Sequence, residues 1–191
     1  FNDKEVDELV FLDISANQHG NGPNFELIKD IASEAFMPFA YGGGVTSVEH
    51  IEALFKIGVE KVVINTAYVD NLDFIRKASS LAGSQSIVAS IDVKRTFLGA
   101  YKVYSQNGTK LLSKSPLELA KELENAGVGE IILTSIDEEG KRKGVDLKLI
   151  ELISKELSIP LVASGGVGEL SHIKAAADVG ASAVAVGSFF V

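Results

Sequence analysis

Short apolar runs alternate along this chain with longer stretches in which apolar residues recur every three or four positions. The short runs are rich in β-branched residues, and they predict strands that are buried on both faces. These expected strands are 9–14, 38–42, 61–65, 87–92, 130–135, 160–164 and 183–187. The longer stretches carry the apolar stripe of amphipathic helices. The expected helices are 25–36, 47–57, 72–81, 116–126, 147–157 and 170–179.

The segment 99–112 departs from this alternation. Two short runs, 100–105 and 110–112, flank the turn residues Gln106-Asn107-Gly108. Because Asn-Gly is a common pair at tight hairpin turns, we expect a β-hairpin inserted after the fourth strand.

The chain also nearly repeats itself. Residues 8–66 align without a gap on residues 130–188, an offset of 130 − 8 = 122 positions, and about a quarter of the aligned pairs are identical. The matched positions include Pro38 with Pro160, 43–45 with 165–167, His50 with His172, and Gly58 with Gly180. A repeat of this length indicates two copies of one supersecondary unit, so a ligand site in one copy predicts a second site in the other.

Apolar strands that alternate with helices predict parallel βαβ units. Seven such strands with an internal twofold repeat favour an α/β fold of the (β/α)8 TIM-barrel type over an open doubly wound sheet. The register of the repeat predicts that the first strand and the last helix of a complete barrel are missing from the chain. We expect one domain over 1–191, built from half-barrel repeats at about 8–66 and 130–188.

Composition narrows the possible functions. The formal net charge of −8 argues against a nucleic-acid partner, which would require a basic face. The longest uncharged apolar run, 181–191, is too short to span a membrane, and the charged residues 1–8 do not resemble a signal peptide. Cysteine is absent, which excludes disulfides and thiolate chemistry but leaves the compartment open. From the composition as a whole we expect a cytoplasmic protein. The spacing of histidines and carboxylates predicts neither a metal site nor a covalent triad, and nothing indicates a cofactor.

Glycine turns follow two of the matched strands. Gly42-Gly43-Gly44 and Ser164-Gly165-Gly166 can bring backbone N–H groups close to an anion, although each can also be a simple tight turn. Asn65-Thr66 and Gly187-Ser188 follow the neighbouring strands and can complete two anion cups, with helix N-capping as the alternative. Two cups suit a substrate with a phosphate at each end.

Carboxylates follow other strands. Asp92 and Asp13 come directly after apolar runs and are candidates for general acid–base catalysis, although Asp13 can instead cap a loop or helix. Asp137 and its neighbours Glu138 and Glu139 follow a further strand, where they can orient substrate hydroxyl groups.

Glu8, Glu130 and Lys61 begin strands at the opposite end, where they form either a capping network or a gate to the barrel interior. The helical residues His50 and His172 are expected to be surface residues. The polar loop that holds His19 can be either plain loop or ligand-facing.

Taken together, these motifs resemble the cyclase subunit of imidazole glycerol phosphate synthase over essentially the whole chain. The matching stretches are 7–14, 42–44, 61–67, 83–85, 91–95, 129–137 and 163–166. The stretch Leu133–Asp137 separates this family from its sister barrel, the ribonucleotide isomerase of the same pathway. The resemblance implies a lyase of histidine biosynthesis that forms a heterodimer with a glutaminase subunit and receives ammonia through the barrel. Its substrate is a phosphoribulosyl-formimino aminoimidazole carboxamide ribotide, which carries two phosphates.

The resemblance also implies residue roles. Asp92 matches a catalytic aspartate, whereas the family's first-strand aspartate has no counterpart in this sequence. Gly44, Asn65 and Thr66 match one phosphate site, and Gly140, Gly166, Gly187 and Ser188 match the other. Glu8, Lys61 and Glu130 match the ammonia gate. The supporting polar residues are Asp13, Gln85, Thr134, Asp137 and Ser164.

Some positions depart from the family pattern. Lys141 stands where the family usually has a threonine, and Val63 replaces a frequent serine. The segments 20–25 and 187–191 look more like a paralogous branch that supports amidation of bacterial surface-polysaccharide sugars. In that alternative the chain conducts ammonia without catalysing cyclisation.

Overall fold

The computed structural model describes residues 6–16, 22–69 and 71–190. The chain forms two compact units: unit 1 is Phe1–Val88 with Ala126–Val128, and unit 2 is Ala89–Asn125 with Gly129–Val191. The first repeat, 8–66, therefore lies in unit 1 and the second, 130–188, lies in unit 2. The prediction of a single domain over 1–191 stays a prediction.

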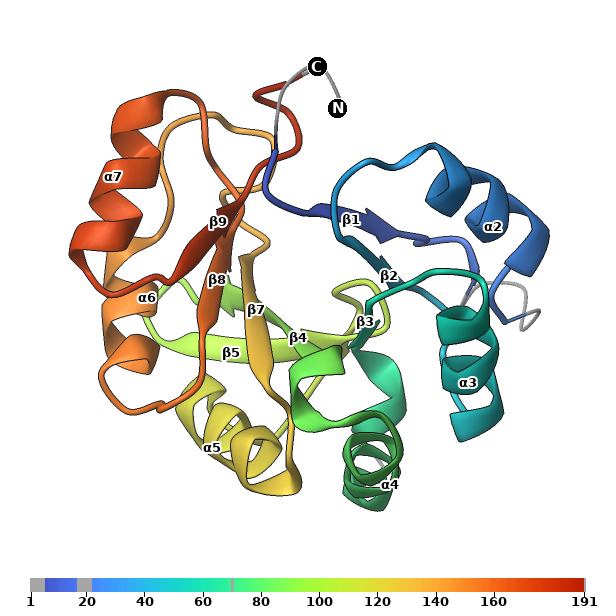
Figure 1. Cartoon of the computed structure of the whole chain (residues 1–191). Helices are drawn as coiled ribbons and strands as arrows, with labels where there is room; N and C mark the ends of the chain where they lie inside the picture. Colours follow the sequence, from blue (N-terminus) through green and yellow to red (C-terminus); the bar gives the residue numbers. More distant parts are fainter. Residues whose placement is uncertain (1–5, 17–21, 70, 191) are drawn as a thin grey trace. The chain divides into compact units, whose positions relative to one another are not determined.

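Unit 1 alternates strands with helices, coloured blue to green in Figure 1. Its elements are β1 (Leu9–Leu12), α2 (Phe25–Glu34), β2 (Phe39–Gly42), α3 (Val48–Lys56), β3 (Lys61–Ile64), the 3-10 helix η2 (Thr66–Tyr68), α4 (Leu72–Ala82) and the 3-10 helix η3 (Ser84–Ser86). The strands β1 and β2 are parallel, with Leu12 opposite Gly42. The strands β2 and β3 are also parallel, with Gly42 opposite Val63.

Unit 2 contains most of β4 (Ile87–Arg95) and the rest of the chain's elements. These are β5 (Tyr101–Ser105), β6 (Lys110–Leu111), α5 (Pro116–Ala126), β7 (Glu130–Ser135), α6 (Leu147–Ser154), β8 (Leu161–Ser164), α7 (Leu170–Asp178) and β9 (Ala183–Ala185). The strands β7, β8 and β9 are parallel neighbours. The predicted hairpin is confirmed, because β5 pairs antiparallel with both β4 and β6.

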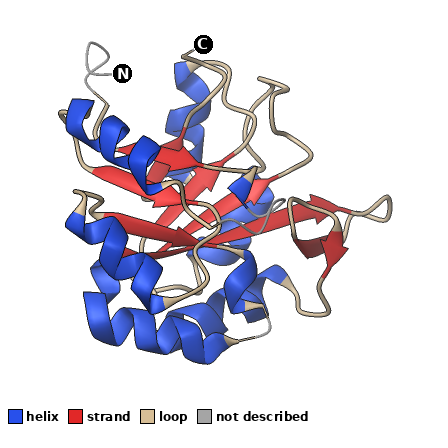
Figure 2. Cartoon of the chain, turned by 90° about the vertical axis from the view of Figure 1, so that its right-hand side faces the viewer, coloured by secondary structure: helices blue, strands red, loops and turns tan. Residues whose placement is uncertain are grey.

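Apolar stripes of the helices meet apolar strands within each unit. In unit 1, Ile28, Ile51 and Leu54 are fully buried beside the strand residues Val62 and Ile64. The buried side chains of unit 2 likewise come from both strands and helices. They include Ile131, Leu133, Leu123, Ile153 and Leu161. Figure 2 shows the strands in red and the helices that connect them in blue. The predicted class, α/β of the (β/α)8-barrel type, is confirmed.

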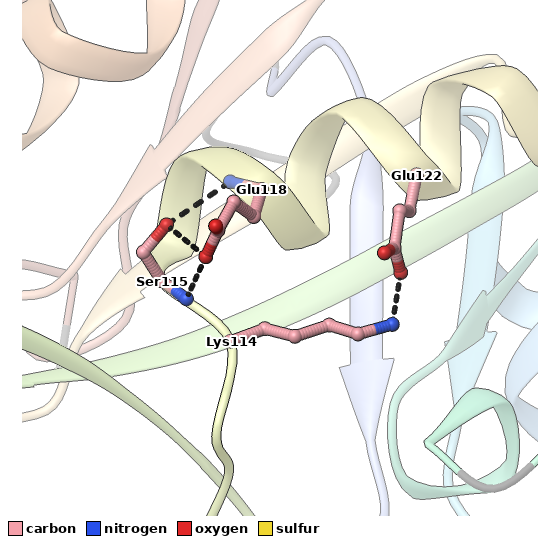
Figure 3. Close-up of polar contacts among 4 residues, drawn as sticks. All are labelled: Lys114, Ser115, Glu118 and Glu122. Atoms are coloured by element: carbon pink, nitrogen blue, oxygen red, sulfur yellow. Dashed lines mark hydrogen bonds and ion pairs between the residues drawn. The ribbon is translucent and has the colours of Figure 1, made fainter.

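Helix starts are fixed by local polar contacts. At the start of α5, the Ser115 hydroxyl accepts a hydrogen bond from the Glu118 N–H at 3.3 Å, and the Glu118 carboxylate accepts one from the Ser115 N–H at 2.8 Å (Figure 3). This reciprocal capping box satisfies two backbone donors that the helix leaves without intrahelical partners. One turn later, Lys114 and Glu122 form an ion pair along the helix surface.

Most predicted elements are correct within three residues at each end. The main difference is β4, which continues to Arg95 rather than ending at Asp92. The physical reason is the hairpin, because β5 pairs with 92–95 and gives that extension hydrogen-bonded partners. Over the described part of the chain, no helix is long and apolar enough to cross a membrane.

Candidate functional site

The first predicted cup lies at the carboxyl ends of β2 and β3. Gly42 and Val63 are opposite each other in these parallel strands, so Gly44 and Asn65 each lie two residues beyond a matched pair. Gly44 is buried and has a φ of +63°, a left-handed conformation that glycine adopts readily. Asn65 precedes η2, which begins at Thr66. Asn65 and Thr66 therefore follow β3, and the glycine turn follows the neighbouring strand β2.

The second cup repeats this arrangement within unit 2. Ser164 and Ala185 are opposite each other in β8 and β9, so Gly166 and Gly187 again lie two residues beyond a matched pair. Gly166 is buried with a φ of +94°, and Ser188 is half-buried. The matched register means that each glycine turn lies beside the end of its neighbouring strand. Gly140, predicted for the same cup, lies in the exposed loop between β7 and α6.

The second cup also contains a contact that sequence reasoning missed. The guanidinium of Arg142 donates a hydrogen bond to the Ser188 carbonyl. Lys141 is exposed, and its Nζ lies 3.8 Å from a Glu138 carboxylate oxygen. Cationic residues at 141–143 favour an anionic ligand nearby, and this cluster of positive charge was the available sequence signal.

Asp92 is half-buried within β4. Its Oδ1 lies 3.5 Å from the Ser90 hydroxyl, and Ser90 is itself buried at 6% exposure. Lys94, two residues on, donates a hydrogen bond to the Gly108 carbonyl at 2.8 Å and lies over the Tyr104 ring. A half-buried carboxylate of this kind can exchange a proton with a bound substrate.

Asp13 caps the loop that follows β1. Its Oδ1 accepts hydrogen bonds from the Ser15 hydroxyl at 2.6 Å and from the N–H groups of Ser15 and Ala16 at 2.9 and 3.1 Å. The hydroxyl contact, with the two N–H contacts, holds the pKa of Asp13 below its ordinary value against the opposing effect of burial. Asp13 therefore remains an ionised acceptor near neutral pH rather than a general acid.

The remaining supporting residues are placed as follows. Thr134 and Ser164 are half-buried and opposite each other in β7 and β8. Asp137 follows β7, and its carboxylate accepts a hydrogen bond from the Arg95 N–H at 2.6 Å. Gln85 is exposed within η3. His19 lies outside the described residues.

The opposite strand ends carry the predicted gate residues. Glu8 directly precedes β1 and Lys61 begins β3, and their side chains form an ion pair of 2.7 Å in unit 1. The side chains are 27% and 25% exposed, respectively, so the pair is partly shielded from water. Glu130, the repeat mate of Glu8, begins β7 in unit 2 and is half-buried.

The two helical histidines are half-buried and contact the loops that precede their helices, which the sequence did not predict. His172 Nδ1 accepts a hydrogen bond from the Gly168 N–H at 3.1 Å, and its side chain is 21% exposed. His50 is half-buried, with Nδ1 3.5 Å from the Thr46 nitrogen and its ring edge-on to Phe25. The helix periodicity placed both residues on the outer surface, but their position in the first helical turn directs the rings back onto the preceding loops.

Comparison with known proteins agrees with the resemblance seen in the sequence. The family model described as "Histidine biosynthesis protein" matches residues 1–191. A Pseudomonas aeruginosa protein provisionally named imidazole glycerol phosphate synthase subunit hisF2 is 50% identical over 100% of this chain and 76% of its own length. A Campylobacter jejuni protein with the same provisional name is 45% identical over 97% of this chain and 73% of its own length.

A further relative has the HisF designation without a number. It is the imidazole glycerol phosphate synthase subunit HisF of Thermococcus onnurineus, which is 40% identical over 100% of this chain and 75% of its own length. The family match and these identities, over nearly the whole chain, lead to one conclusion. The chain belongs to the histidine biosynthesis protein family, alongside imidazole glycerol phosphate synthase subunits of the HisF and hisF2 types.

Proposed function

We propose that this chain is the cyclase subunit of an imidazole glycerol phosphate synthase. It uses ammonia to convert a phosphoribulosyl-formimino aminoimidazole carboxamide ribotide into imidazole glycerol phosphate and aminoimidazole carboxamide ribotide. The observation that carries the proposal is the pair of cups built in the same register, with Gly44 and Asn65 in one and Gly166 and Gly187 in the other. The proposed substrate carries two phosphates, which matches the number of cups.

In each cup, backbone N–H groups and hydroxyl groups hold a phosphate. Gly44, Asn65 and Thr66 form the first cup, and Gly140, Gly166, Gly187 and Ser188 form the second. Arg142 adds a positive charge next to Ser188, to which it is hydrogen-bonded. Backbone N–H groups suit this task because they approach an anion closely. They also bind it without the entropy cost of ordering a side chain.

Asp92 is the residue that we assign to proton transfer. Its carboxylate is half-buried at a strand position where the buried Ser90 hydroxyl lies 3.5 Å away. Ammonia must lose a proton after it attacks carbon, and the leaving amine must gain one, so a carboxylate can serve both steps. Asp13, Gln85, Thr134, Asp137 and Ser164 are supporting polar residues.

Ammonia reaches the site from a glutaminase subunit in a cytoplasmic heterodimer. The Glu8–Lys61 ion pair is at the amino ends of β1 and β3, the end of these strands opposite the first cup, and Glu130 begins β7 in unit 2. We assign Glu8, Lys61 and Glu130 to the ammonia gate, as the resemblance implies.

The cups can be tested by substrate affinity. Gly44→Ala and Gly166→Ala place a methyl group at the turn, and each should weaken binding of the bis-phosphate substrate by about 10- to 100-fold. Gly58→Ala is the matched control, because Gly58 also has a positive φ of +101° but a Cβ there meets only Ala32 at 3.8 Å. Unchanged substrate affinity in both cup variants would contradict the proposal.

A second function has specific support. The relatives at 50% and 45% identity have the hisF2 designation, and Lys141 departs from the family's usual threonine. In this alternative the barrel conducts ammonia for amidation of surface-polysaccharide sugars and does not catalyse cyclisation. A folded protein that conducts ammonia from a glutaminase but never turns over the bis-phosphate substrate would favour this alternative.

A further inference from the structure

Both phosphate cups have the same structural support, which the repeat preserves residue by residue. The glycine turns at Gly44 and Gly166 are 122 positions apart (166 − 44), as are His50 and His172 (172 − 50). The loop glycines Gly22 and Gly144 have the same offset (144 − 22), although they precede different helices.

In the second repeat, these residues are in direct contact. The Gly144 N–H donates a hydrogen bond to the Gly166 carbonyl at 2.8 Å, and a Cβ on Gly166 would lie 2.1 Å from the Gly144 carbonyl oxygen. A Cβ on Gly144 would in turn lie 3.6 Å from the His172 ring. The Gly144 backbone is therefore packed between the imidazole and the glycine turn.

The first repeat has the same order of contacts. A Cβ on Gly44 would lie 3.0 Å from the Gly22 Cα, and a Cβ on Gly22 would lie 3.1 Å from His50 Cε1. In both repeats the imidazole Nδ1 also accepts from the backbone N–H two residues after the cup glycine. These contacts are 3.5 Å from Thr46 and 3.1 Å from Gly168. An imidazole that accepts at Nδ1 carries its proton on Nε2.

We propose that His50 and His172 are positioning residues of the two phosphate cups. Each imidazole holds one backbone N–H with Nδ1 and packs its ring against the loop glycine, which keeps the glycine turn ready to bind phosphate. The inference rests on the proposed function, which assigns the two cups to phosphate binding. Pre-orienting donors in this way raises affinity because less conformational freedom is lost on binding.

The test uses the full-length protein and inorganic phosphate as the probe. The backbone amide signals of Gly44 and Gly166 report phosphate binding at each cup separately in NMR titrations. His→Phe keeps a ring of similar size but removes the acceptor, whereas His→Asn places an oxygen close to the Nδ1 position. His→Gln places its oxygen nearer to the Nε2 position. The glutamine variant is used in place of the phenylalanine variant if the latter does not fold.

We expect His172→Phe to weaken phosphate binding at Gly166 by about fivefold, the scale of one hydrogen bond, and to leave Gly44 unchanged. His50→Phe should act only at Gly44, with a smaller loss because its contact is longer. Each asparagine variant should stay within about twofold of wild type. Hydrogen exchange at the Thr46 and Gly168 amides should become faster in the phenylalanine variants and stay slow in the asparagine variants.

Two results would overturn the inference alone: phosphate affinity unchanged in the phenylalanine variants, or asparagine variants as weak as phenylalanine. If neither glycine signal of the wild-type protein responds to phosphate, the cup assignment fails and the inference fails with it. The wild-type titration therefore separates failure of the proposed function from failure of the histidine inference.

Discussion

The Asp137 carboxylate accepts a hydrogen bond from the backbone N–H of Arg95 at 2.6 Å, across 42 positions of sequence. Asp137 follows β7 and Arg95 is the last residue of β4, so the contact joins the ends of two strands in unit 2. The Ile136 N–H donates to the Val93 carbonyl at 2.9 Å beside it. Asp137 therefore has a structural role in holding these strand ends, separate from any contact with substrate.

Substitutions of Asp137 test its structural role. Asp137→Ala should lower the free energy of unfolding by about 1 kcal/mol, because the Arg95 N–H loses its acceptor. Asp137→Asn keeps an acceptor oxygen and should stay close to wild type in urea unfolding. Asp178→Ala is the control, since Asp178 forms an exposed ion pair with Lys174 on the surface of α7. Equal losses in the alanine and asparagine variants would contradict the structural role.

The buried hydroxyl of Tyr41 can be tested by its effect on the stability of the protein. Its side chain is fully buried in β2, and its hydroxyl has no hydrogen-bond partner among the described residues. Tyr41→Phe removes an unsatisfied polar group without changing the ring, so it should raise the free energy of unfolding by about 1 kcal/mol. A loss of stability of that size would instead indicate a hydrogen bond to the hydroxyl.

The same residue predicts alkaline behaviour. Burial raises the pKa of Tyr41 far above its ordinary value of 10.0, and the nearby Asp13 carboxylate adds to this. Tyr41 therefore stays neutral when folded but ionises in the unfolded chain above about pH 10, so its contribution to stability falls as the pH rises beyond that value. Stability curves of wild type and Tyr41→Phe between pH 9 and 11 should diverge, and parallel curves would contradict the assignment.

The gate can be tested by comparing two nitrogen sources. Lys61→Ala removes the cation that faces Glu8 at 2.7 Å. In the heterodimer it should reduce glutamine-dependent turnover about tenfold and change ammonia-dependent turnover little, because free ammonia reaches the reaction site without passing the gate. Lys77→Ala is the control, since Lys77 pairs with Asp73 on the exposed surface of α4. Equal loss with both nitrogen sources would argue against a gate.

The elements were predictable because hydrophobic periodicity is strong in this chain. β7 and α5 have the predicted bounds, since an apolar run and an apolar stripe each end at a clear break. Ile14, Asn65, Pro38 and Pro160 lie outside the strands that they were predicted to join. Proline lacks the N–H that a ladder needs, which accounts for the last two.

The repeat was the sequence signal that marked the two glycine turns of the candidate site. The offset of 122 positions identified both glycine turns, and the structure gives them matched registers. The Arg142–Ser188 contact could not be predicted, because it joins two loops without periodicity. The histidine contacts had a usable signal, since Gly22 and His50 match Gly144 and His172 in the repeat. Periodicity alone cannot show that a ring in the first helical turn faces a loop.

Ammonia-dependent turnover of the bis-phosphate substrate by the full-length protein, without its partner, tests the central claim most directly. The account predicts saturable formation of imidazole glycerol phosphate, and loss of this activity in a folded Asp92→Asn variant, because an amide cannot accept and return the proton. Absence of turnover in the folded wild-type protein would contradict the cyclase assignment, and turnover that survives in Asp92→Asn would contradict the role given to Asp92.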